Sequence, residues 1–153
     1  MEKGKPWTAA CFGGYCAMML WLLLCRSGSG GEAAYWEAVK GHLNLVPFRT
    51  IARYIRLLGW TENRYLRIHA LVNLAGNVVL FLLMGCFLPA LFPRLRKIRK
   101  TLLWTALAVG AVEGMQLFLT VGSCDIDDLI LNTAGAALGY LAWWLFRGRM
   151  KKG

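Results

Sequence analysis

Four carboxylates in the C-terminal part of the sequence have the types and spacing that could support chemistry. Asp125, Asp127 and Asp128 fall within one short stretch, and Glu113 is the only charged residue in 101–124. A pair of carboxylates can perform acid–base catalysis, and carboxylate oxygens are ligands that divalent cations prefer. Candidate catalytic residues are therefore Glu113, Asp127 and Asp128, and candidate metal ligands are Asp125, Asp127 and Asp128. A divalent cation is the one cofactor that this set suggests, and no motif identifies a cofactor.

Polar side chains within the apolar stretches form a second set. Each stands three or four residues from another polar residue, so that each pair shares one face of a helix. The pairs are Asn73 with Asn77, Glu113 with Gln116, and Asp128 with Asn132. Two roles stay open for them. The amides can hold neighbouring helices together, or the set can form a functional site, and the aspartates can alternatively cap the helix that follows them.

Four long apolar runs must position these side chains. Hydrophobic residues make up 58% of the 153-residue chain, whereas a soluble domain has about 45–50%. The runs predict helices over about 7–25, 69–92, 101–121 and 129–146. Each has about the 20 apolar residues that a helix needs to span a bilayer. The sequence therefore predicts an all-α polytopic membrane protein with four transmembrane helices, as a single membrane domain over 1–153.

Basic residues set the expected orientation. Lysine and arginine are concentrated at both ends of the chain and in the connection 94–100, whereas the connection that holds the aspartates has no basic residue. The segment 26–68 also holds seven basic residues, but the positive-inside rule gives long loops less weight. Four crossings put both termini and the basic connection on one side, and the positive-inside rule makes that side cytoplasmic. The net charge of +10 is thus explained by topology and lipid contact, and nucleic acid is not an expected partner.

The first outer loop, 26–68, contains an amphipathic pattern over 49–58. One helical face carries Ile51, Tyr54, Ile55 and Leu58, and the other carries Arg49, Arg53 and Arg56. Such a helix is suited to lying in the headgroup layer. Its arginines would contact lipid phosphates or another anion, or they would only anchor the loop.

These placements converge on one depth. At about 1.5 Å per residue, the amides and Glu113 lie roughly 5–12 Å below the outer surface. We therefore expect a one-sided polar pocket beneath the amphipathic helix. Two small-residue pairs, Gly110 with Gly114 and Gly135 with Gly139, predict close helix packing.

Five motifs resemble the VanZ-like family, in the correct order over roughly 42–141. They are Asn44-Leu-Val-Pro-Phe-Arg-Thr-Ile51, Asn73-x-x-x-Asn77, Glu113-x-x-Gln116, Asp125-Ile-Asp-Asp128 and Asn132-Thr-x-Gly135-x-x-x-Gly139-Tyr140. The resemblance implies a small bacterial protein of the cytoplasmic membrane, from a family named for an accessory protein associated with teicoplanin resistance. Members often carry a basic residue shortly before the acidic motif. Here that stretch is 120–122 and has none, so that Arg49 or Arg53 would have to substitute.

Three functions are consistent with this pattern. The first is binding of a lipid or lipid-linked cell-wall head group, which would contribute to glycopeptide (teicoplanin) resistance or envelope homeostasis. The second is an intramembrane enzyme acting on a lipid head group through Glu113 and the aspartates. The third is a non-catalytic helper or scaffold. The candidate binding residues are Asn44, Arg49, Arg53, Asn73, Asn77, Glu113, Gln116, Asp125, Asp127, Asp128 and Asn132.

Overall fold

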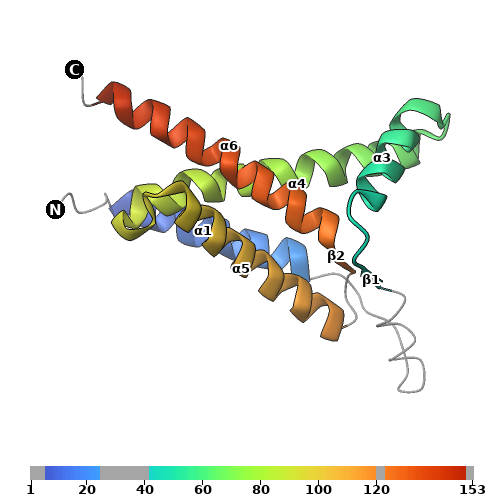
Figure 1. Ribbon diagram of the computed structural model, residues 1–153, viewed down its shortest axis with the longest axis horizontal. Coiled ribbons are helices and arrows are strands. Elements are labelled where there is room, and N and C mark those ends of the chain that lie inside the picture. The colour runs from blue at the N-terminus through green and yellow to red at the C-terminus, as the bar shows by residue number, and fades with distance from the viewer. Residues whose placement is uncertain (1–5, 25–41, 120–122, 151–153) are drawn as a thin grey trace.

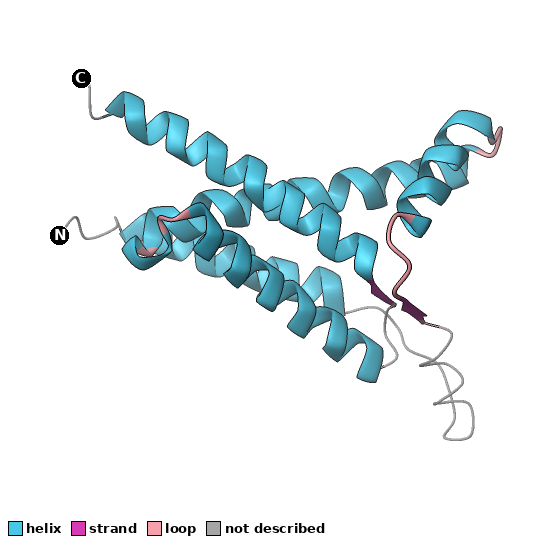
Figure 2. Ribbon diagram, viewed as in Figure 1, coloured by secondary structure: helices cyan, strands magenta, loops and turns pink. Residues whose placement is uncertain are grey.

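The computed structural model describes residues 6–24, 42–119 and 123–150, and within these ranges the chain is almost entirely helical (Figures 1 and 2). The helices are α1 (Pro6–Leu24), α3 (Arg49–Trp60), α4 (Arg64–Leu91), the 3-10 helix η1 (Pro93–Leu95), α5 (Ile98–Phe118) and α6 (Ile126–Met150). Two short strands, β1 (Leu43–Asn44) and β2 (Cys124–Asp125), complete the described elements.

Among the described helices, three are long and apolar enough to cross a membrane, namely α4, α5 and α6. This confirms the all-α class and the membrane-length helices. The first predicted crossing forms α1, and a total of four crossings stays a prediction. The amphipathic pattern forms α3, and the stretch 120–122 lies outside the described residues.

Helix α4 begins earlier than predicted because its first turn is capped. The side chain of Asn63 accepts hydrogen bonds from the backbone N–H groups of Tyr65 at 3.0 Å and Leu66 at 3.3 Å. Such a cap satisfies N–H groups that have no partner within the helix. As a result, α3 and the start of α4 form a hairpin that projects from one end of the molecule (Figure 1).

Glycines bring α4 and α6 into direct backbone contact. A Cβ atom added to Gly135 would collide with the backbone of Val78, and one added to Gly139 would collide with the backbone of Leu82. Gly85 makes the reciprocal approach from α4, against the backbone of Ala136. The predicted packing role of Gly135 and Gly139 is confirmed.

The other small-residue pair does not pack. In the described part of the chain, no neighbouring atom lies within 4 Å of a Cβ built on Gly110 or Gly114. The prediction of close packing through this pair is therefore wrong. The buried positions of α5 are instead Thr101, Thr105, Val109, Glu113 and Gln116.

Helix α1 joins the bundle through aromatic residues. Its Tyr15 hydroxyl donates to the carbonyl of Leu80, and the ring of Phe12 lies 5.8 Å from that of Phe87 on α4. Both described termini and η1 lie at one end of the molecule, while α3 and the two strands lie at the other (Figure 1). The polar residues of interest therefore gather at the end that carries α3.

Candidate functional site

A two-residue strand pair joins the outer segment to the acidic motif. Strand β1 runs parallel to β2, with Leu43 opposite Cys124 and Asn44 opposite Asp125. The N–H of Cys124 also donates to the carbonyl of His42 at 2.9 Å. This pairing places the Asn44–Ile51 motif directly beside the aspartates.

Asp127 caps the start of α3. Its carboxylate is completely buried and accepts backbone hydrogen bonds from Phe48, Thr50 at 2.7 Å and Ile51 at 3.0 Å. Phe48 is in the left-handed conformation, with φ 64°, and its own side chain provides no cap. A buried negative charge at a helix N-terminus satisfies unpaired N–H groups and interacts favourably with the dipole. Asp127 therefore fixes where α3 begins and how it is oriented.

Asp125 ties the same segment down through side chains. One of its oxygens accepts the Thr50 hydroxyl at 2.6 Å, and the other accepts the Asn44 amide at 3.1 Å. The Asn44 amide also donates to the Thr50 hydroxyl oxygen at 3.0 Å. The backbone N–H of Asp125 donates to a carboxylate oxygen of Glu113 at 3.1 Å. A continuous network thus links α5, β2, β1 and α3.

The aspartates cap two helices. Asp125 directly precedes α6 and accepts the backbone N–H of Asp127 at 2.9 Å, which is the cap considered from the sequence. Asp127 lies in the first turn of α6, but its oxygens bind N–H groups of α3. Within the described residues, no three His, Cys, Asp or Glu side chains are grouped so as to hold a metal ion. The geometry gives Asp125 and Asp127 the role of hydrogen-bond acceptors that position the outer segment.

The amide residues are divided between this network and other contacts. Asn77 donates to Asp128 at 2.6 Å, which links α4 to α6. Asn73 instead donates to the carbonyl of His69, on its own helix, at 2.8 Å. Asn132 is 3% exposed, and its side-chain oxygen has no hydrogen-bond partner among the described residues. The predicted set therefore converges in part, with Asn73 outside the network.

Glu113 and Gln116 are buried on one face of α5, as their spacing predicted. Glu113 is 7% exposed and Gln116 is 5% exposed. Glu113 enters the network through the N–H of Asp125. The interior face of α5 therefore carries the polar side chains, in agreement with the cost of exposing them to lipid.

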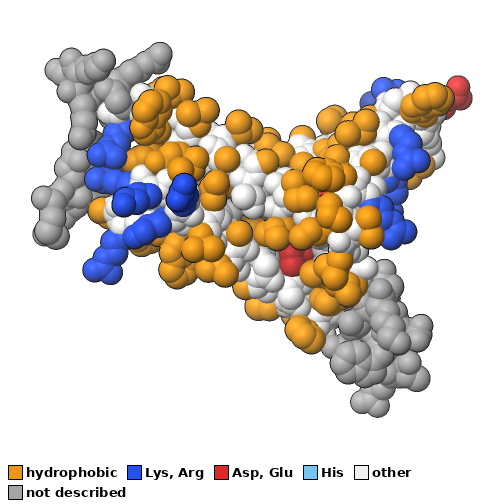
Figure 3. Space-filling model, in the orientation of Figure 1, with side chains coloured by type: hydrophobic (Ala, Val, Ile, Leu, Met, Phe, Trp, Pro, Cys, Tyr) orange, Lys and Arg blue, Asp and Glu red, His pale blue; other side chains and the backbone are white. Residues whose placement is uncertain are grey.

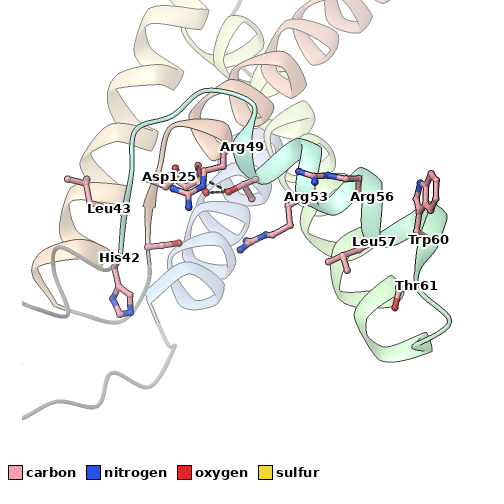
Figure 4. A pocket seen from close by; sticks show the side chains of 12 residues that line it. His42, Leu43, Arg49, Arg53, Arg56, Leu57, Trp60, Thr61 and Asp125 are labelled. Carbon is pink, nitrogen blue, oxygen red and sulfur yellow. Dashed lines mark hydrogen bonds between the residues drawn. The ribbon is translucent and has the colours of Figure 1, made fainter.

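An open groove lies beside this network, between α3 and the strand segment (Figure 4). Its volume is about 650 Å³. We call it the arginine groove, and its lining residues are His42, Leu43, Asn44, Arg49, Thr50, Arg53, Arg56, Leu57, Trp60, Thr61, Ser123 and Asp125. The predicted residues Asn44, Arg49, Arg53 and Asp125 all belong to it.

Three exposed arginines of α3 line the groove. Arg53 extends from α3 into the space between that helix and the His42 segment (Figure 4), and its guanidinium lies 5.2 Å from the ring centre of Tyr54. Arg56 donates to the carbonyl of Ala52 at 3.4 Å. Among the residues that the structure describes, no carboxylate forms an ion pair with Arg49, Arg53 or Arg56. These cations are available to an anion from outside.

Sequence reasoning missed Thr50, Arg56 and the neutral lining residues His42, Thr61 and Ser123. Only Thr50 and Arg56 had a signal in the sequence. Thr50 bridges Asp125 and Asn44, and its position within the Asn44–Ile51 motif was the signal that could have identified it. Arg56 was placed on the basic face of the amphipathic helix but was not among the candidate binding residues, although it lines the groove.

Comparison with known proteins identifies one family. The family model described as VanZ/LLP1 matches residues 12–147, which include every residue of the site. No curated protein and no solved structure matches the chain significantly.

Proposed function

The chain belongs to the VanZ/LLP1 family, and we propose that it binds the phosphate-bearing head group of a lipid or lipid-linked cell-wall intermediate in the arginine groove. Through this binding it contributes to glycopeptide (teicoplanin) resistance or to envelope homeostasis. The observation that carries the proposal is the set of three exposed arginines along one groove of about 650 Å³, none of which forms an ion pair with a carboxylate of the described residues. Volumes of this order are typical of small-molecule sites, at about 300–1,000 Å³.

The proposal places the protein in the bacterial cytoplasmic membrane with four crossings, α1, α4, α5 and α6. Lysine and arginine side chains gather at the end that holds the termini and again over α3, while hydrophobic side chains cover the middle of the visible face (Figure 3). The end with the termini and η1 is assigned to the cytoplasm by the positive-inside rule. The end with α3 then faces outward.

Helix α3 belongs in the outer headgroup layer under this topology. Ile51, Tyr54 and Leu58 are half-buried on one side of the helix, and the arginines are exposed on the other. Trp60, which ends the helix, is 89% exposed, and tryptophan favours the membrane interface. An arginine face at this level meets lipid phosphates with charge-assisted hydrogen bonds.

Neutral donors and acceptors complete the groove. The hydroxyls of Thr61 and Ser123 and the side chain of His42 line it beside the arginines. Such groups suit the sugar, amide or hydroxyl groups that accompany phosphate in a head group. The acidic network supports the site indirectly, because Asp127 holds the first turn of α3 from which Arg49 projects.

The direct test is native mass spectrometry of the detergent-extracted protein titrated with polyprenyl phosphate. Arg49→Gln/Arg53→Gln/Arg56→Gln should weaken adduct formation at least tenfold, since one charged hydrogen bond is worth about 1.5–3 kcal/mol and 1.4 kcal/mol is tenfold. The matched control is Arg64→Gln/Arg67→Gln, which removes exposed cations of α4 that do not line the groove. Equal weakening in both variants would contradict binding in the groove.

A cellular test addresses the consequence. Expression of the wild-type chain in a teicoplanin-susceptible bacterium should raise the inhibitory concentration, and the arginine variant should not, at equal abundance in the membrane. An unchanged inhibitory concentration with the wild type would reject the resistance role and leave the binding experiment to decide on the head group.

A further inference from the structure

A second cavity lies at the opposite end of the bundle, beside the connection between α4 and α5. Its volume is about 780 Å³. We call it the basal cavity, and its lining residues are Phe12, Met84, Leu88, Phe92, Pro93, Arg94, Leu95, Trp104 and Ala108. These come from α1, α4, the η1 connection and α5. All are apolar except Arg94.

The connection that borders the cavity is fixed by hydrogen bonds to its backbone. The Tyr140 hydroxyl of α6 donates to the carbonyl of Arg96 at 2.8 Å. The hydroxyl of Thr101, a fully buried residue, donates to the carbonyl of Leu95 at 2.6 Å. On the α1 side, the ring of Phe12 packs edge-on against the ring of Phe92, with 6.2 Å between the ring centres. The cavity is therefore bounded by ordered elements from three helices.

The charges around the cavity have one sign. Arg94 is exposed, and the connection 94–100 also contains Arg96, Lys97, Arg99 and Lys100 but no acid. In the described part of the chain, no carboxylate forms an ion pair with Arg94. An open apolar cavity, bordered by a cation that has no carboxylate partner among the described residues, is complementary to an amphiphile that has an apolar tail and an anionic head.

We infer that the basal cavity binds one anionic phospholipid, with an acyl chain against Phe12, Leu88 and Trp104 and the phosphate at Arg94. The site is separate from the arginine groove, because the two share no lining residue, and α3 lies at the opposite end of the bundle from the connection between α4 and α5 (Figure 1). A second copy of the chain is the weaker candidate for occupant. A symmetric contact at this end would bring two basic connections together, and like charges oppose that association.

The test is native mass spectrometry with phosphatidylglycerol and phosphatidylcholine of equal chain length, added separately to the delipidated protein. The wild type should bind one phosphatidylglycerol about tenfold more tightly than phosphatidylcholine, because the choline cation offsets the phosphate charge near Arg94 whereas phosphatidylglycerol keeps a net negative charge. Arg94→Gln should remove this preference. Arg99→Gln is the matched control, because it removes the same charge from the same connection at a residue that does not line the cavity.

A second pair of variants tests the cavity itself. Ala108→Phe should fill the chamber and weaken binding of both lipids at least tenfold, and Ala108→Leu should do so to a smaller extent. Thermal unfolding of each variant is followed by circular dichroism, and a variant that does not fold leaves the Arg94 and Arg99 pair to decide. Both filling variants should leave the polyprenyl phosphate adduct unchanged, so that this test is independent of the proposed function.

Three results would overturn the inference. If Arg94→Gln and Arg99→Gln weakened phosphatidylglycerol binding equally, the lipid would be held by diffuse attraction to a basic surface. Unchanged phosphatidylglycerol binding in a folded Ala108→Phe protein would exclude the chamber. A wild-type dimer that Ala108→Phe converts to monomer would identify a second copy as the occupant.

Discussion

Both ends of the bundle present arginines that form no ion pair with a carboxylate in the described part of the chain, but the reason differs between the two ends. At the end with α3 the chain carries three aspartates and Glu113, yet each of these carboxylates accepts hydrogen bonds from N–H or hydroxyl donors. At the basal end, the connection 94–100 contains no acid that could pair with Arg94.

This difference shows how a chain can keep cations available beside its own carboxylates. The carboxylate of Asp127 receives three backbone donors and is completely buried. A carboxylate that is saturated in this way gains little from an additional arginine, because the arginine would have to lose its hydration. Arg49 and Arg53 therefore stay free for an external anion. The acidic motif builds the groove without neutralising it.

The largest effect should come from Asp127→Ala. The substitution leaves three N–H groups at the start of α3 without their acceptor, and a hydrogen bond to a charged group is worth about 1.5–3 kcal/mol. We expect the free energy of unfolding in mixed micelles to fall by about that amount. Because the loss is local to α3, polyprenyl phosphate binding should disappear while phosphatidylglycerol binding at the basal cavity persists.

The matched control for this prediction is Glu62→Gln, which removes an exposed acid in the turn between α3 and α4. Its unfolding free energy should stay within about 0.5 kcal/mol of the wild type, as for most surface changes. Parallel loss of both lipid adducts in Asp127→Ala would show that the two ends do not behave independently.

A smaller effect should distinguish the two glycine pairs. Gly139→Ala places a methyl group against the backbone of Leu82, and overpacking of this kind costs typically 1–3 kcal/mol. Gly110→Ala is the control, because a Cβ there meets no described atom within 4 Å, and it should be neutral or stabilising by about 0.4–1 kcal/mol. Unfolding in mixed micelles measures both, and equal losses would contradict the difference in packing.

The helical framework could be predicted from the sequence because hydrophobic run length and helical spacing are local properties. The all-α class, the helix over 49–58 and the packing of Gly135 and Gly139 all follow from such patterns. Gly110 and Gly114 have the same spacing but face away from the partner helices. Spacing identifies a face of small residues, and only the arrangement of the other helices decides whether that face is covered.

The detailed site depended on contacts that no local pattern records. The Asp127 carboxylate caps α3, and the capped residue Ile51 lies 76 positions earlier in the sequence. Strands as short as β1 and β2 show no alternation of side chains. Asn73 and Asn77 have the same residue type and share a helix face. Asn77 donates a hydrogen bond to Asp128 of α6, whereas Asn73 donates to the carbonyl of His69 within its own helix. The amide alone does not distinguish the two outcomes.

The conformation of Phe48 gives the next prediction. It has φ 64°, the only positive φ at a non-glycine among the described residues, and its side chain is 60% exposed. The left-handed conformation costs an L-residue about 1–2 kcal/mol, and the entropy that glycine loses on folding offsets part of the gain. Phe48→Gly should therefore raise the free energy of unfolding by up to about 1 kcal/mol.

Leu45→Gly is the control for Phe48. Leu45 is also exposed, at 61%, and it does not have a positive φ, so glycine there should lower the unfolding free energy by about 0.5–1 kcal/mol. The same sign of change in both variants would argue that the backbone of Phe48 is not strained by the cap on Asp127.

The smallest effect concerns the reactivity of Cys124 at the polar end. Partial burial, and then the negative charges of Glu113 and Asp125, raise the pKa of its thiol above the ordinary value of 9.0. Since the thiolate is the reactive form, a raised pKa leaves less thiolate at every pH below it. With the other cysteines replaced by serine, the iodoacetamide alkylation rate of Cys124 should keep rising beyond pH 9.

The control is Ser123→Cys in the same background, with Cys124→Ser, which puts a thiol on the exposed neighbour. This thiol should react faster at pH 8, and its rate should level off at a lower pH. Superimposable pH profiles would show that the carboxylates beside Cys124 carry no charge that the thiol senses. The end with α3 would then not differ from the basal end in the negative charge that it presents.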